Sequence, residues 1–232
     1  MKTLKKIIPT LIIALLLFQS CKDNDTDVVI IPETNTIVDI AVNEPDLSNL
    51  VTALGLADGN LVSLLSGGEY TLLAPNNFAF DLFLTNNGFS SLDDVPVDIL
   101  TNILLNHVVG GRLASTDLTT GYATTFALSS ASQASMSIFI DTSNGVRFNG
   151  VSSVSMADIS ADNGIVHVVD AVIGLPSVVT FAVADPTFST LVAALTRDDL
   201  TTDFVGVLST ATGTSPAPFT VFAPTNDAFG SL

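Results

Sequence analysis

The sequence is short of cysteine, tryptophan and basic side chains, and these shortages exclude several classes of protein. One cysteine in 232 residues cannot form an intramolecular disulfide, and one thiol with two histidines cannot build a zinc finger or a zinc ribbon. The chain has 7 basic residues against 23 acidic ones. Binding to nucleic acid depends on clustered Lys and Arg side chains that displace counterions, so nucleic acid is excluded as a partner.

Motifs of common enzyme families are also missing. The chain contains no GxSxG, HExxH, GxGxxG or P-loop string. Its adjacent carboxylates, such as Asp93 with Asp94, do not face each other on a helix or a strand, so we interpret them as solvated charge. Two carboxylates brought together by the fold remain open as a glycosidase pair. We predict a protein without enzymatic activity, cofactor or metal ion.

The first 21 residues have the pattern of an export signal. Lysines in the first six positions precede an apolar run from Ile7 to Phe18, which is shorter than the about 20 residues that span a bilayer. We therefore interpret residues 1–20 as a signal peptide. The only cysteine, Cys21, stands at the expected cleavage site, and the segment LFQSC resembles the lipobox of bacterial lipoproteins. That resemblance implies a lipid on Cys21; an ordinary signal peptide with an incidental cysteine is the alternative.

The residues after Cys21 predict an acidic tether over 21–34. The segment KDNDTD has alternate aspartates like a calcium loop, but Val28 stands where such a loop needs glycine. We expect no calcium site there, and a solvated segment that holds the folded part off the membrane. A lysine followed by acidic residues also resembles the signal that exports some lipoproteins of Gram-negative bacteria. We therefore expect a lipid-anchored protein of the outer membrane that faces the exterior.

The sequence repeats part of itself. The segment IVDIAVNEPDLSNLVTAL at 37–54 aligns without gaps to VVTFAVADPTFSTLVAAL at 178–195. The segment YTLLAPNNFAF at 70–80 aligns to FTVFAPTNDAF at 219–229. Both matches keep their order along the chain, so we predict two copies of one domain.

The first copy is expected to be complete over residues 35–175, and residues 177–232 to hold the first part of a second copy. The second copy stops soon after its second match, so we expect it to be truncated. Its apolar faces would then need downstream sequence, or the first copy, to cover them.

Residue patterns predict helices followed by strands. Leu47, Leu50 and Leu54 recur at helical spacing between Pro45 and Gly55. Further helices are expected at 61–65, at 98–106 and after the first APNN string, with strands at 70–73, 124–128, 136–140, 146–148 and 165–173. The second copy is expected to add a helix at 187–195 and a strand at 219–223. Helices first and a meander of strands after them predict an α+β domain.

These segments resemble the fasciclin (FAS1) domain family. The strings at 70–80 and 219–229 are similar to the first signature of that family, and NGIVHVVDAVI at 163–173 is similar to its second. The resemblance implies an α+β fold in which a wedge of β-strands is flanked by helices. It also implies secreted or membrane-anchored proteins that adhere to cells or matrix.

The resemblance directs attention to Asn106 and His107. The family often has a Tyr-His pair there, which in animal members is tied to integrin recognition. Asn106 replaces the tyrosine, so we do not carry integrin binding over, and the two residues stay a candidate interaction region. We favour a core role for His107 and for His167, each hydrogen-bonded to the backbone.

The remaining motif residues are expected to be structural. Asn77 and Asn226 are interpreted as helix caps, and Phe80 and Phe229 as core residues. Asp170 is expected to hold a turn or a helix N-terminus. The other two motif residues are Pro75 and Pro224.

The leading hypothesis is a lipid-anchored adhesion or matrix-binding module that acts through many weak contacts. Its partner would be an unidentified molecule of the cell surface or matrix. The alternative is an accessory lipoprotein that binds or scaffolds extracellular polysaccharide. With 2 Tyr and no Trp, the chain has few side chains for stacking on sugars.

Overall fold

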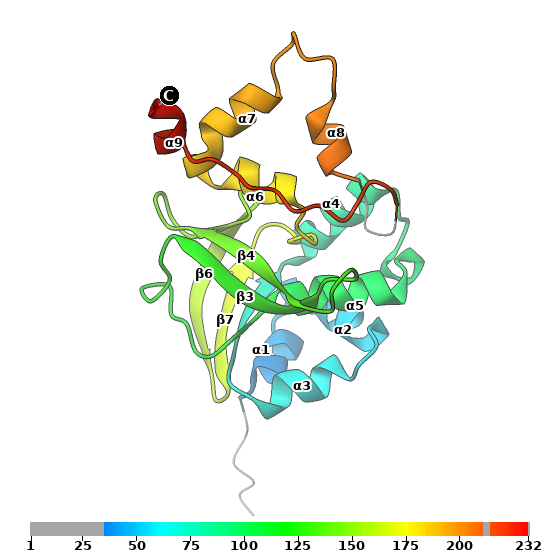
Figure 1. The fold of residues 1–232 in the computed structure, drawn as a ribbon. Coiled ribbons are helices and arrows are strands. Elements are labelled where there is room, and N and C mark those ends of the chain that lie inside the picture. Colours follow the sequence, from blue (N-terminus) through cyan, green and yellow to red (C-terminus); the bar gives the residue numbers. More distant parts are fainter. Residues whose placement is uncertain (1–34, 211–213, 232) are drawn as a thin grey trace, which may run out of the picture. The chain divides into compact units, whose positions relative to one another are not determined.

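The computed structural model describes residues 35–210 and 214–231 (Figure 1). The signal peptide, Cys21 and the acidic tether lie outside the described residues. Within them, no single helix is long and apolar enough to cross a membrane. Two bent pairs of helices reach that length and composition, Pro45–Leu56 with Leu61–Gly67 and Val178–Ala184 with Pro186–Leu195.

The first part of the chain is mainly helical. The helices are α1 (Ile37–Asn43), η1 (Pro45–Leu47), α2 (Ser48–Leu56), α3 (Leu61–Gly67), α4 (Asn77–Asn87), η2 (Leu92–Asp94) and α5 (Val97–Asn106). Helix α1 begins at a capping box in which Thr36 and Asp39 bond to each other's backbone N–H groups. Gly88 ends α4 with a φ of 73°, a left-handed conformation that favours glycine. Local sequence signals thus set where α1 begins and where α4 ends.

Seven strands form one closed sheet in the order β1 to β7, with β7 paired back to β1. They are β1 (Tyr70–Pro75), β2 (Val108–Gly110), β3 (Gly121–Leu128), β4 (Ser135–Asp141), β5 (Arg147–Phe148), β6 (Ser152–Ala161) and β7 (Gly164–Val169). Strands β1 and β7 run parallel, from Tyr70 opposite Gly164 to Pro75 opposite Val169. A side chain at Gly164 would collide with the carbonyl oxygen of Tyr70, so only glycine fits there.

The domain has two apolar clusters, one on each face of β1. The helical cluster lies between the sheet and the helices, which gather on one side of the sheet in Figure 1, and it includes Leu72 and Phe80. The inner cluster is enclosed by the sheet and includes Leu73. Successive side chains of a strand point to opposite faces, so β1 contributes to both clusters. This arrangement confirms the α+β class expected from the sequence.

The start of α1 is bonded to the turn between β6 and β7. The backbone N–H of Asn35 donates to the Asp162 carboxylate (2.8 Å), and the N–H of Asp162 donates to the Asn35 carbonyl (2.8 Å). The N–H of Ile37 donates to Oδ1 of Asn163 (2.9 Å). The chain therefore enters the domain beside the first residue of β7.

Two features of the first domain differ from expectation. Strand β6 was not predicted, because its outward side chains are largely polar and a bulge interrupts its alternation. Asp158 in that strand has a φ of 62°, and the register with β7 shifts on both sides of Met156. Strand β7 also ends at Val169 rather than at 173.

The C-terminal part repeats the first helices. Its elements are α6 (Val178–Ala184), η3 (Pro186–Phe188), α7 (Ser189–Leu195), α8 (Phe204–Leu208) and α9 (Asn226–Gly230). The prediction of a strand at 219–223 is wrong, because in the described part of the chain no strand lies beside these residues to pair with them. Phe222 in this segment is 93% exposed, whereas Leu73 at the equivalent place in β1 is 1% exposed.

The interpretation of Asn77 and Asn226 as caps is also wrong. The cap of α4 is Asn76, whose Oδ1 accepts the N–H of Ala79 (2.8 Å). The Asn77 amide instead donates to the Pro45 carbonyl (3.0 Å) and accepts the N–H of Asn49 (2.9 Å). It thereby fastens the start of α4 to the start of α2.

The same amide contacts recur in the C-terminal part. Asn226 donates to the Pro186 carbonyl (3.0 Å) and accepts the N–H of Thr190 (2.9 Å), while Thr225 caps α9. The repeat seen in the sequence is therefore a repeat of three-dimensional contacts.

We expect Phe80→Ala to lower the free energy of unfolding by about 3 to 5 kcal/mol, because the Phe80 ring is 1% exposed within the helical cluster. Phe78→Ala, two residues earlier, is the matched control. Its ring is 62% exposed, and its loss should cost under about 1 kcal/mol. Urea titration of both variants measures the difference, and equal costs would contradict this assignment of the core.

Candidate functional site

The candidate interaction residues Asn106 and His107 lie at the junction of α5 and β2, and both are fully buried. The Asn106 amide donates to the carbonyl oxygens of Ile173 (3.2 Å) and Gly174 (3.1 Å). Its Oδ1 accepts the hydroxyl of Thr125 (3.1 Å). Asn106 thus joins α5 to the segment after β7 and to β3, and its side chain is not available to a partner in the folded protein.

The His107 ring is held in its neutral form by two backbone groups. The N–H of Ile173 donates to Nε2 (2.9 Å), so Nε2 carries no proton, and Nδ1–H donates to the Ile103 carbonyl (2.8 Å). Burial lowers the pKa of His107 to about 4, and the hydrogen bond to Ile103 opposes that shift only in part. His107 is a structural residue at the centre of the domain.

His167 is buried in β7 and is also bonded to backbone at both nitrogens. The N–H of Asp158 donates to Nδ1 (3.2 Å), and Nε2–H donates to the Leu113 carbonyl (2.9 Å). Ser115 lies nearby, and its hydroxyl and its backbone N–H both donate to the Asp158 carboxylate. These two bonds from Ser115 lower the pKa of the Asp158 carboxyl. Because both nitrogens of His167 are occupied, it cannot act as a base for Ser115, and the three residues do not form a nucleophilic triad.

The other motif residues divide between core and surface. Pro75 is the buried last residue of β1. Asp170 follows β7 and accepts the N–H of Ser153 (2.7 Å), so it ties β7 to β6 rather than to a turn or a helix N-terminus. In the C-terminal part Pro224 is exposed and Phe229 is only half-buried, so Phe229 is not the core residue we expected. Its environment lacks the strands that enclose Phe80.

The described residues contain no group of three His, Cys, Asp or Glu side chains placed to hold a metal ion. Each polar motif residue in this part of the chain instead bonds to the backbone of another segment, namely Asn77, Asn106, His107, His167, Asp170 and Asn226.

A contact that the sequence did not reveal joins the first domain to the C-terminal part. The hydroxyl of Tyr122 in β3 donates to Asp185 (2.9 Å), and its ring packs edge-on against Phe181 with centroids 5.5 Å apart. Burial, together with the Asp185 carboxylate, raises the pKa of Tyr122. Asp185 also accepts the N–H and hydroxyl of Thr187. The only sequence signal is that Asp185 replaces Glu44 of the first copy, and nothing local connects it to Tyr122.

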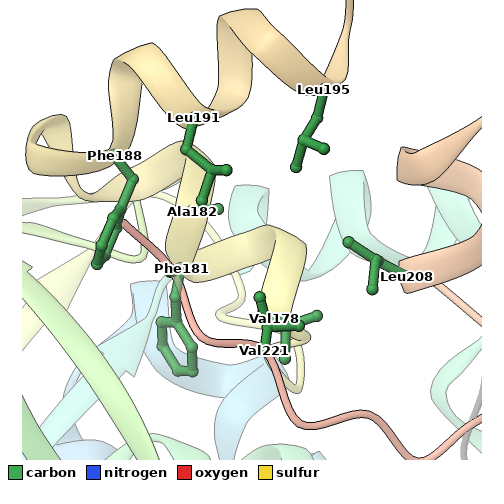
Figure 2. A pocket seen from close by; sticks show the side chains of 9 residues that line it. Val178, Phe181, Ala182, Phe188, Leu191, Leu195, Leu208 and Val221 are labelled. Carbon is green, nitrogen blue, oxygen red and sulfur yellow. The ribbon is translucent and has the colours of Figure 1, made fainter. Parts of the chain in front are cut away.

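The C-terminal helices enclose an apolar groove of about 170 Å³ (Figure 2). Figure 2 shows the side chains of α6, α7 and α8 converging on it, with Val221 of the extended segment along one wall. No residue of these helices is fully buried.

We expect acidification from pH 7 to pH 5 to destabilise the protein by about 2 kcal/mol through His107. The unfolded chain takes up the proton near pH 6.5, whereas the folded chain resists it until about pH 4. The unfolded state therefore binds more protons between these values, and stability falls as the pH falls. Urea titrations at both pH values measure the loss.

His107→Gln is the matched variant for this pH test. It should be less stable at pH 7 but should lose the part of the pH slope that comes from His107. An unchanged slope in the variant would show that other groups carry the pH dependence. Proton NMR of the His107 ring reports its pKa directly.

Comparison with known proteins places this architecture in a family. The model of the fasciclin domain matches residues 45–176. The protein sll1735 of Synechocystis sp. is 37% identical over 139 residues, which cover 59% of this chain and 96% of the relative. The cell surface glycolipoprotein MPB83 of Mycobacterium bovis is 42% identical over 77 residues, 31% of this chain and 33% of that protein.

An animal protein and a solved structure also match. The transforming growth factor-beta-induced protein ig-h3 of Sus scrofa is 28% identical over 200 residues, which cover 80% of this chain and 27% of that protein. The structure of a FAS1 domain pair from the insect cell adhesion molecule Fasciclin I aligns with a TM-score of 0.45 and 24% identity, over 63% of this chain and 51% of that chain. Because the family model spans more than half of the sequence, this chain belongs to the fasciclin domain family.

Proposed function

We propose that this protein is a cell-surface adhesion module that binds a partner of the matrix or of another cell and performs no catalysis. The observation that carries the proposal is the family match over residues 45–176. The mycobacterial relative named a cell surface glycolipoprotein supports the surface location. The export pattern of residues 1–20 and the lone Cys21 support a lipid anchor, placed in the outer membrane and facing the exterior.

The domain organisation belongs to the same proposal. Residues 35–175 would form the first fasciclin domain, and residues 177–232 the first part of a second. The recurring contacts of Asn77 and Asn226 support this division, because the same amide joins the same two helix starts in both parts.

The contact surface of the first domain is proposed to include the outer face of α4. Phe78 and Leu82 lie one turn apart on that helix, and they are 62% and 41% exposed. Asp227 and Ser231 occupy the equivalent places in the C-terminal part, so the repeat itself does not require apolar side chains there. Exposed aromatic and aliphatic side chains that the fold does not need are typical of binding surfaces.

This surface is tested with beads that carry the full-length protein on a layer of extracellular matrix prepared from the producing cells. Phe78→Ser with Leu82→Ser is expected to weaken retention about tenfold, the effect of losing a contact worth about 1.4 kcal/mol. Val151→Ser, at an equally exposed valine in the turn before β6, is the matched control and should retain the beads. Unchanged retention of the double variant would exclude α4.

The same assay separates the adhesion proposal from its alternative. Protease treatment of the matrix layer should abolish retention if the partner is a protein. Retention that survives protease and is competed by one soluble polysaccharide would favour the polysaccharide-binding function instead.

The lipid anchor is tested by Cys21→Ser. The variant should leave the membrane fraction and lose incorporation of labelled fatty acid, because the thiol is the proposed attachment atom. Ser20→Ala, which keeps the thiol, is the control and should stay in the membrane. A Cys21→Ser variant that fractionates like the wild type would refute the anchor. Protease added to intact cells then tests its side, since protection until the outer membrane is opened would place the protein on the periplasmic face.

A further inference from the structure

Several side chains in the walls of the C-terminal groove are the counterparts of residues in the helical cluster of the first domain. Four pairs relate the two, according to the sequence repeat: Val178 to Ile37, Leu191 to Leu50, Leu195 to Leu54 and Val221 to Leu72. The first-domain members are at most 6% exposed. Val221 is 40% exposed, and Val178, Leu191 and Leu195 are only partly buried. The groove therefore has the side chains of the helical cluster, but they are more exposed to solvent than in the first domain.

The first domain shows what covers this core. Strand β7 lies beside β1 in parallel, and its Val166 and Val168 belong to the helical cluster together with Leu72. The equivalent of β1 in the C-terminal part is the segment 219–224, for which no pairing strand is present in the described residues. Among the residues that the structure describes, no backbone–backbone hydrogen bond involves 219–224. Val221 lies along the groove wall (Figure 2).

We propose that the segment 219–224, together with its groove, is a docking site for one extended polypeptide strand with the chemistry of β7. The strand pairs in parallel, with a glycine opposite Phe219 and β-branched side chains opposite Val221 and Ala223. An extended apolar strand edge accepts such an addition through main-chain hydrogen bonds, while the groove selects the side chains. This inference goes beyond adhesion and rests on the proposed second domain.

The register makes the proposal specific. Tyr70 faces Gly164 in the first domain, where a side chain would collide with the Tyr70 carbonyl. Phe219 occupies the place of Tyr70, so the docking strand must also begin with glycine. The second and fourth residues after that glycine correspond to Val166 and Val168, which face the helices in the first domain. The expected occupant is therefore a strand from the second half of a fasciclin domain.

The test attaches such a strand to the full-length chain. The C-terminus is extended by a flexible Gly/Ser linker of about 15 residues, followed by a second copy of residues 163–174. Such a linker reaches about 20 Å, similar to the length of a six-residue strand, and gives an effective concentration on the order of 1 mM. Hydrogen exchange is then compared between the extended and the unextended chain.

The expected result is slower exchange, by about tenfold or more, of the amides at 219–223 in the extended chain. The first control carries Val166→Asp and Val168→Asp only in the appended copy, and the second carries Val221→Asp in the groove. Both should lose the added protection, while the amides of residues 70–74 stay protected and show that the first domain is folded.

Three outcomes would overturn the proposal. Unchanged exchange at 219–223 would show that the groove does not accept the strand. Equal protection by the Asp-bearing strand would show that the added chain covers the surface without recognition. Protection in the unextended chain that grows with concentration, with a dimer in sedimentation, would show that a second copy of the chain is the occupant.

Discussion

The parallel pairing of β1 with β7 is the interaction on which the rest of the first domain depends. It joins residues almost a hundred positions apart and closes the seven-stranded sheet. Because β1 is buried along nearly its whole length, it serves both apolar clusters, through Leu72 on the helical side and Leu73 inside the sheet. The close approach of the two backbones requires glycine at position 164.

The polar network around this pair explains why the histidines belong to the core. His107 connects the end of α5 to the chain beyond β7, and His167 connects β7 to the loop before β3 and to the bulge in β6. Each ring satisfies backbone groups that irregular chain segments would otherwise leave unpaired in an apolar interior. An imidazole suits this task because its neutral form offers one donor and one acceptor on opposite sides.

Much of the first domain could be predicted from the sequence, because periodicity and turn residues act locally. The helices around Leu50 and Leu61 and the turn at Asn149 and Gly150, both with positive φ, follow from such signals. The sequence repeat also distinguishes the roles of Asn76 and Asn77. Asn76 and its counterpart Thr225 both cap helices. Residues 77 and 226 are Asn in both copies, and each side-chain amide donates to one backbone group and accepts from another.

Contacts between residues far apart in the chain could not be predicted from the sequence. The bond between Tyr122 and Asp185 depends on how the C-terminal helices lie against β3, which no local pattern reports. The segment 219–223 has the composition of a strand, yet a strand exists only where another chain segment pairs with it. For the same reason the burial of Asn106 became evident only when Ile173, Gly174 and Thr125 were seen around it.

The bonds of Asn35 and Ile37 to Asp162 and Asn163 have a mechanical consequence. The chain enters the domain beside the first residue of β7 and leaves it beyond the other end of that strand, toward Ser177. Tension between a surface anchor and a bound C-terminal part would therefore run along β7 and load its hydrogen bonds to β1 and β6 together in shear. The domain would transmit force through β7, while the helices around Phe80 stay outside the load path.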